Sequence, residues 1–196
     1  HEGRVEGVDV AEGAIEIARQ RCSELANVGF QVGDATSLPF DDSTFDAVMS
    51  SQVFEYLDDV PAALLEVRRV LKPSGRVVIH DTDWGTAVWH SGDADRTDRM
   101  MDVWDGHLAD PFLPRTMGAK LNNGGFGNVH SEAFVQLDTG YDASSASGIR
   151  IGFIAEYGVS QGVSRSEADA WLDDLKALGA DYFCSWNEYI FTANRA

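Results

Sequence analysis

The sequence predicts an α/β fold built on a doubly wound, mostly parallel sheet, and two observations support this prediction. Short β-branched segments alternate with helix-like segments through the first half of the chain. The links between them are short, which is typical of β-α-β units with parallel strands. The chain has 196 residues, of which 44% are hydrophobic, enough for the core of one domain. We therefore expect a single domain over residues 1–196.

The first half of the chain supplies the strands of this sheet and the helices between them. β-branched and apolar runs predict strands over Arg4–Val10, Val28–Val32, Phe45–Ser50 and Arg76–His80. Helical spacing of apolar residues predicts helices over Ala11–Ala26 and Ala62–Leu71. Pro61 suits the first turn of the second helix, and Gly75 follows its end. A strand, a helix and a further strand in this order favour parallel neighbours.

The second half is mostly helical and ends in an aromatic-rich strand. The helices that we expect cover Asp93–Leu108, Arg115–Asn123, Ser144–Tyr157 and Ser164–Leu178. Alternating apolar residues predict strands over Val129–Leu137 and Tyr182–Thr192. Ser164 and Glu167 form the Ser-x-x-Glu pattern of a capping box at the start of the last helix. No run of about 18 apolar residues occurs, so the sequence predicts no membrane-spanning helix.

The charge of the chain excludes several classes of partner. Thirty-two acidic residues against 15 basic ones give a net charge of −17. Such a surface repels nucleic acids and anionic membranes, and we expect neither as a partner. The acidity fits either a high-salt habitat or an ordinary acidic protein. Two cysteines, Cys22 and Cys184, make no disulfide framework or zinc motif, which favours a cytoplasmic protein without a metal.

Polar groups stand at the ends of three predicted strands, where ligands of a doubly wound sheet bind. Asp9 ends the first strand, where a carboxylate can accept hydrogen bonds from both hydroxyls of a ribose. Asp34 and the backbone N–H of Ala35 follow the second strand and can read the edge of an adenine. Ser50 and Ser51 end the third strand, whose open carbonyls can hold an ammonium group. A lone acid at a strand end is usually a turn former, but two at successive strand ends favour a nucleoside site.

Three blocks of sequence, Gly7–Glu12, Gly33–Val48 and Leu64–Arg76, fall in a fixed order in the first half of the chain. Together they resemble the cofactor-binding segments of class I S-adenosylmethionine-dependent methyltransferases. The likeness is closest to the small-molecule enzymes of the ubiquinone and menaquinone biosynthesis type. It implies a Rossmann-like sheet with an antiparallel C-terminal strand. It also implies transfer of a methyl group, by in-line displacement, to a small apolar or aromatic metabolite.

The resemblance assigns S-adenosyl-L-methionine binding to particular residues and exposes one departure from the family pattern. The cofactor-binding residues that it implies are Asp9, Val10, Asp34, Ala35, Phe40 and Ser50. In the family, a strand and a glycine-rich loop stand before the position of Asp9, and both are absent from this sequence. That strand lies in the middle of the sheet. We therefore expect a gap between the strands that end at Asp9 and Ser50. The chain is then either part of a longer polypeptide or one whose N-terminal part is disordered, and a truncated, inactive product also remains open.

The end of the fourth predicted strand carries the candidates for catalysis. His80 and Asp81 are the candidate bases, and His80 is favoured by its ordinary pKa near neutrality. Asp83, Trp84 and Trp104 are the candidate acceptor-binding residues. We expect segments 84–123 and 144–178 to roof the acceptor site. They carry further aromatic residues that could enclose an acceptor, namely Trp89, Phe112, Phe153, Tyr157 and Trp171.

Two other functions remain open at this point. An NAD(P)-dependent oxidoreductase would use Asp9 for its ribose equally well, although no tyrosine has a lysine four residues later. A non-catalytic module that binds an adenosyl ligand would also fit the absent glycine-rich loop. The sequence does not identify the small-molecule acceptor or the oligomeric state, and a homodimer remains open.

Overall fold

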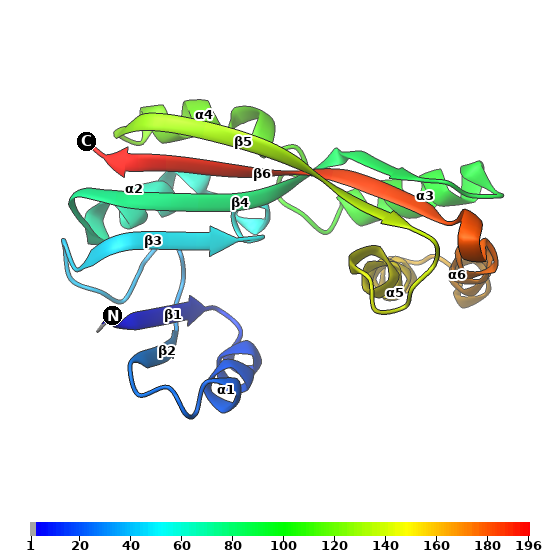
Figure 1. The fold of residues 1–196 in the computed structure, drawn as a ribbon, viewed down its shortest axis with the longest axis horizontal. Coiled ribbons are helices and arrows are strands. Elements are labelled where there is room, and N and C mark those ends of the chain that lie inside the picture. Colours follow the sequence, from blue (N-terminus) through cyan, green and yellow to red (C-terminus); the bar gives the residue numbers. More distant parts are fainter. Residues whose placement is uncertain (1–2) are drawn as a thin grey trace.

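The computed structural model describes residues 3–196 and shows one long mixed sheet with helices on it, beside a smaller two-stranded unit (Figure 1). The strands are β1 (Val5–Asp9), β2 (Val28–Val32), β3 (Phe45–Ser51), β4 (Leu71–Trp89), β5 (Phe126–Thr139) and β6 (Phe183–Arg195). The helices are α1 (Glu12–Arg21), α2 (Val60–Val70), α3 (Ala94–Asp105), α4 (Pro114–Asn123), α5 (Ala146–Ser160) and α6 (Arg165–Ala177). Short 3-10 turns cover Phe54–Tyr56 and Gly179–Asp181. Among these residues, no helix has the length and apolar character needed to cross a membrane.

The strands form two separate sheets. β1 pairs with β2 in parallel, and the larger sheet has the order β3-β4-β6-β5. β3 is parallel to β4, whereas β6 runs antiparallel to both β4 and β5, so the antiparallel C-terminal strand is confirmed. Within residues 3–196, no pairing joins β1 to β3, and the expected gap is present. The sheet is more evenly mixed than the sequence predicts, because β6 makes two long antiparallel pairings.

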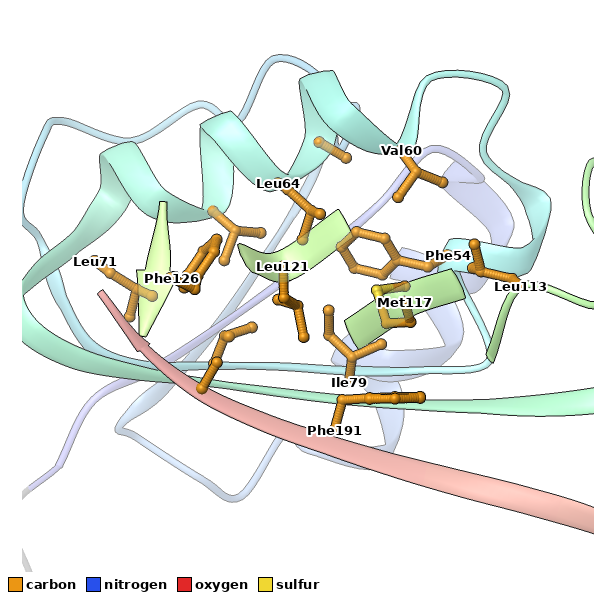
Figure 2. Packing of buried hydrophobic residues seen from close by; sticks show 14 residues of the cluster. Phe54, Val60, Leu64, Leu71, Ile79, Leu113, Met117, Leu121, Phe126 and Phe191 are labelled. Atoms are coloured by element: carbon orange, nitrogen blue, oxygen red, sulfur yellow. The ribbon is translucent and has the colours of Figure 1, made fainter. Parts of the chain in front are cut away.

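The first hydrophobic cluster lies between the larger sheet and helices α2 and α4. Asp59 caps α2 by accepting a hydrogen bond from the Ala62 N–H at 2.9 Å. Figure 2 shows Leu64 of α2 and Leu121 of α4 directed toward Ile79 of β4. This packing fixes β3 and β4 side by side and places their carboxyl ends at one edge.

The second cluster lies at the other end of the sheet, where β4 and β6 extend past the end of β3 and meet α3, α5 and α6 (Figure 1). Trp171 of α6 is fully buried, and its indole N–H donates to Thr97 Oγ1 at 3.1 Å. Trp89 Nε1 donates to the Tyr182 hydroxyl at 3.2 Å, and that hydroxyl donates to Ser147 Oγ at 2.8 Å. These hydrogen bonds join α3 to α6, and α5 to β4, within the aromatic core.

The amino-terminal unit of β1, α1 and β2 has almost no core of its own. Ile15 is its one buried apolar side chain among the described residues, at 2% exposure. α1 ends at Arg21, five residues before the predicted end at Ala26. Leu25 is half exposed, so a longer α1 would bury little additional apolar surface.

Candidate functional site

The carboxyl ends of β1 and β2 lie side by side, as the sequence predicts. Asp9 is in register with Val32, and the N–H of Gly33 donates to the Asp9 carbonyl at 3.0 Å. Gly33 suits this close approach, because a Cβ there would lie 2.9 Å from Val8 Cγ1. Asp34 therefore follows within two residues of the strand end that adjoins Asp9.

Both carboxylates are exposed, and each also organises its own loop. Asp9 Oδ1 accepts from the Ala11 N–H at 2.8 Å, immediately before α1. Asp34 Oδ1 accepts from the N–H and the hydroxyl of Thr36, both at 2.7 Å. These bonds to Thr36, led by its backbone N–H, lower the pKa of Asp34 and keep its charge. Because each set of bonds uses Oδ1, the second carboxylate oxygen can face a ligand.

The other predicted cofactor residues lie at different distances from this pair along the chain. Val10 is 70% exposed beside Asp9, and Ala35 packs partly against the first cluster. Ser50 is the last residue but one of β3, and its hydroxyl is buried without a hydrogen-bond partner among residues 3–196. Phe40 packs edge-to-face on Phe45, with ring centroids 4.7 Å apart, at the amino end of β3. The structure therefore does not bring Phe40 to the strand ends that carry the two acids.

His80 lies in a chain of hydrogen bonds across three strands. Its Nδ1 is 2.9 Å from the hydroxyl oxygen of Ser51, which is exposed. Its Nε2 is 2.8 Å from Oε2 of Glu188 on β6, and Oε1 of Glu188 accepts from Trp186 Nε1 at 2.9 Å. The ring also stacks on Phe134 at 5.7 Å. When Nε2 donates to Glu188, Nδ1 can accept the proton of the Ser51 hydroxyl.

Asp81 points away from His80 into the protein and is 1% exposed. Its Oδ1 accepts from the Val53 N–H at 3.1 Å, and its Oδ2 has no partner among the described residues. Burial, with the negative charge of Glu55 second, raises the pKa of Asp81 to about 8. Burial also raises the pKa of Glu55, whose Oε2 accepts from the Thr82 N–H at 3.2 Å. Two buried carboxyl groups with raised pKa values are typical of a functional site.

Asp83 takes part in an ion pair. Both of its carboxylate oxygens accept from Arg115, at 2.7 and 2.9 Å, and Oδ1 also accepts from the Gly85 N–H at 3.1 Å. The side chain is almost fully buried. Its hydrogen bonds anchor α4 to β4, so the geometry gives no support to a role for Asp83 in acceptor binding.

A pocket of about 390 Å³ opens between β4, α3 and α5. Its walls include the predicted residues Trp84 and Trp104. The lining is completed by Gln52, Glu55, Tyr56, Arg150, Phe153 and Tyr157. The pocket adjoins the end of β3 through Gln52, which directly follows Ser51. Gln52 Oε1 accepts a hydrogen bond from the Thr82 hydroxyl at 3.0 Å. Of the other predicted aromatics, Trp89 and Trp171 lie in the core, and Phe112 packs under Arg115.

The sequence analysis missed three polar residues of this site, which are Gln52, Glu55 and Arg150. Gln52 and Glu55 directly follow the strand end at Ser51. Arg150 is the one basic residue of α5, a helix that is otherwise mostly apolar. A lone charge within an apolar helix is a signal that could have identified it.

Comparison with known proteins agrees with this geometry over the first part of the chain. Residues 1–79 match the family model described as a methyltransferase domain. Demethylmenaquinone methyltransferase of Staphylococcus epidermidis is 40% identical over 84 residues, which are 43% of this chain and 35% of that protein. Over these residues the chain is similar to methyltransferase domains. The chain spans only 24–37% of the length of curated relatives that it matches.

Solved structures share the fold of this chain over almost its whole length. The YcgJ protein from Bacillus subtilis has a TM-score of 0.61 at 21% identity, over 98% of this chain and 83% of that chain. Phosphoethanolamine N-methyltransferase 2 of Haemonchus contortus, in complex with S-adenosyl-L-methionine, has a TM-score of 0.58 at 19% identity. That match covers 98% of this chain and 43% of the other. The Rossmann-like α/β fold expected from the sequence is therefore confirmed.

Proposed function

We propose that this protein is an S-adenosyl-L-methionine-dependent methyltransferase that acts on a small aromatic molecule. The observation that carries the proposal is the pair of exposed carboxylates, Asp9 and Asp34, at adjoining strand ends inside the matched segment. The names of the relatives support methyl transfer, and demethylmenaquinone is itself an aromatic quinone. We further propose that residues 1–196 belong to one domain, because β4 and β6 run through both hydrophobic clusters.

The residues at the strand ends fit this cofactor. Asp9 would accept hydrogen bonds from the ribose hydroxyls, and Asp34 would accept from the adenine amino group while Ala35 donates its N–H. Ser50, near the end of β3, would hold the methionine amine through its backbone carbonyl. When bound, S-adenosyl-L-methionine supplies an electrophilic methyl group on a sulfonium.

This chain would contribute to the reaction by orienting the acceptor and by excluding water from the pocket. The aromatic walls of the pocket would hold an acceptor in a fixed orientation and exclude water. We propose His80 as the base where the acceptor must lose a proton. The Ser51 hydroxyl is the exposed end of the Ser51–His80–Glu188 chain, so a proton would enter through that hydroxyl. Asp81 would fix the position of Val53 by accepting a hydrogen bond from its N–H. Val53 lies in the sequence between the pocket residues Gln52 and Glu55.

Thermal unfolding with two ligands tests the proposal. In the full-length protein, S-adenosylhomocysteine at a hundred times its dissociation constant should stabilise the protein by about 2.7 kcal/mol. NAD should produce a smaller shift, because it shares only the adenosine part of this ligand. Stabilisation by NAD alone would support the oxidoreductase alternative instead. Binding of S-adenosylhomocysteine without methyl transfer to any acceptor would support a non-catalytic module.

A further inference from the structure

Four hydrogen-bond donors of the pocket residues lack partners. Gln52 Nε2, Trp84 Nε1, Trp104 Nε1 and Arg150 Nη1 are buried atoms without an acceptor among the described residues. All four residues line the same 390 Å³ space. Buried donors without acceptors are costly, and several together indicate a missing acceptor group. The residues that carry these unpartnered donors therefore surround one space.

Arg150 adds a positive charge to this set of donors. Its guanidinium carbon lies 4.9 Å from the ring centroids of both Trp84 and Trp186. The two indoles are themselves stacked at 6.3 Å. Within residues 3–196, no carboxylate lies within ion-pairing distance of Arg150, although the chain carries 32 acidic residues. The aromatic rings hold the guanidinium in place without neutralising its charge.

The carboxyl group in the same wall does not supply the missing partner. Glu55 Oε2 already accepts from the Thr82 N–H. Burial raises the pKa of Glu55, which favours its neutral form and weakens its pull on Arg150. The remaining walls are flat and apolar, and they come from Trp84, Phe153 and Tyr157. Such walls suit the faces of a planar ring.

We propose that the acceptor is a planar aromatic carboxylate, whose carboxylate is held by Arg150, Gln52 and Trp104. This inference rests on the proposed function for the role of the pocket as acceptor site. A guanidinium fork matches a carboxylate in geometry and charge, and the ring of the acceptor lies between the aromatic walls. The proposal narrows the class of acceptor from any small aromatic molecule to an acid.

A pair of probes that differ only in charge tests this inference. In the full-length protein saturated with S-adenosylhomocysteine, 2-naphthoate should bind about tenfold or more tightly than 2-naphthamide, as measured by calorimetry. Arg150→Gln should remove this preference, whereas Arg150→Lys should keep part of it. Arg165→Gln is the matched control, because Arg165 pairs with Glu156 on the surface of α6 and should leave the preference unchanged.

The outcomes separate this inference from the proposed function. Affinity for S-adenosylhomocysteine should be the same in Arg150→Gln and in the wild type, which shows that the variant is folded. Equal binding of the two probes to the wild type, no binding of naphthoate, or a preference that survives in Arg150→Gln overturns the inference. Failure of S-adenosylhomocysteine to bind the wild type refutes the proposed function instead.

Discussion

The two ends of the molecule differ in how many apolar side chains they bury and in which polar groups they carry. The amino-terminal unit of β1, α1 and β2 is shallow, with Ile15 as its one buried apolar side chain among the described residues. The aromatic cluster at the far end buries Trp84, Trp104, Trp171 and Trp186 beneath three helices. The first region offers exposed carboxylates to a polar ligand, and the second offers enclosed rings and an unpaired guanidinium.

This difference indicates which region depends on further structure for its stability. β1 pairs only with β2, and β3 pairs only with β4, so within residues 3–196 the facing edges of both sheets are unpaired. The aromatic cluster lies on long paired strands and has its buried hydroxyls satisfied. We therefore expect a strand paired in the gap to stabilise mainly the amino-terminal unit of β1, α1 and β2. The aromatic cluster should be stable without that strand.

The largest expected effect is the difference between one core substitution in each region. Trp171→Ala should lower the free energy of unfolding by about 3–5 kcal/mol, because it empties the centre of the aromatic cluster. Ile15→Ala should cost about 2 kcal/mol, the low end for such truncations, because few side chains surround it. Denaturant unfolding followed by circular dichroism measures both values. Equal losses would contradict the comparison.

The next effect concerns the ion pair that joins α4 to β4. Arg115→Gln leaves the buried Asp83 carboxylate without its guanidinium partner and should cost about 1.5–3 kcal/mol. Arg99→Gln is the control, since its pair with Glu167 is largely exposed and should be worth less than about 1 kcal/mol. If Asp83 instead bound the acceptor, Arg115→Gln would leave stability unchanged and alter acceptor affinity.

A smaller effect, spread over pH, should come from Asp81. Its pKa is raised from an ordinary value of 3.8 to about 8 in the folded protein, so the folded state binds its proton more tightly than the unfolded state. This group therefore favours folding at low pH, and its contribution is lost as pH rises from about 4 to 8. Asp81→Asn should gain stability relative to the wild type across that window, because asparagine does not ionise. A constant difference between the two proteins would show that Asp81 is ionised throughout.

The fold was largely readable from the sequence because its signals are local. β2 spans Val28–Val32 as predicted, since turn residues bound a β-branched run on both sides. β4 was expected to end at His80 but continues to Trp89. Its extension pairs Asp83 with Asn187 and Trp89 with Cys184, and such distant pairing leaves no local pattern.

The site was predictable in part for the same reason. Trp84 and Trp104 were predicted to bind the acceptor from their aromatic character and their place in the chain, and the structure shows that both line one pocket. The ion pair of Asp83 was not predicted, because its partner Arg115 lies 32 residues away in the sequence. Arg150 was missed because the packing of α5 on α3 and α6 decides which face of that helix meets the pocket.

The central claim is that the shallow end binds an adenosyl ligand through its two strand-end acids. Calorimetric titration of S-adenosylhomocysteine into the full-length protein tests it most directly, with Asp9→Asn and Asp34→Asn as variants. Each variant keeps the Oδ1 acceptor of its loop and loses the charge, so affinity should fall about tenfold. Asp41→Asn, an exposed acid of the same loop as Asp34, should bind like the wild type. Unchanged affinity in both Asp9→Asn and Asp34→Asn would contradict the account.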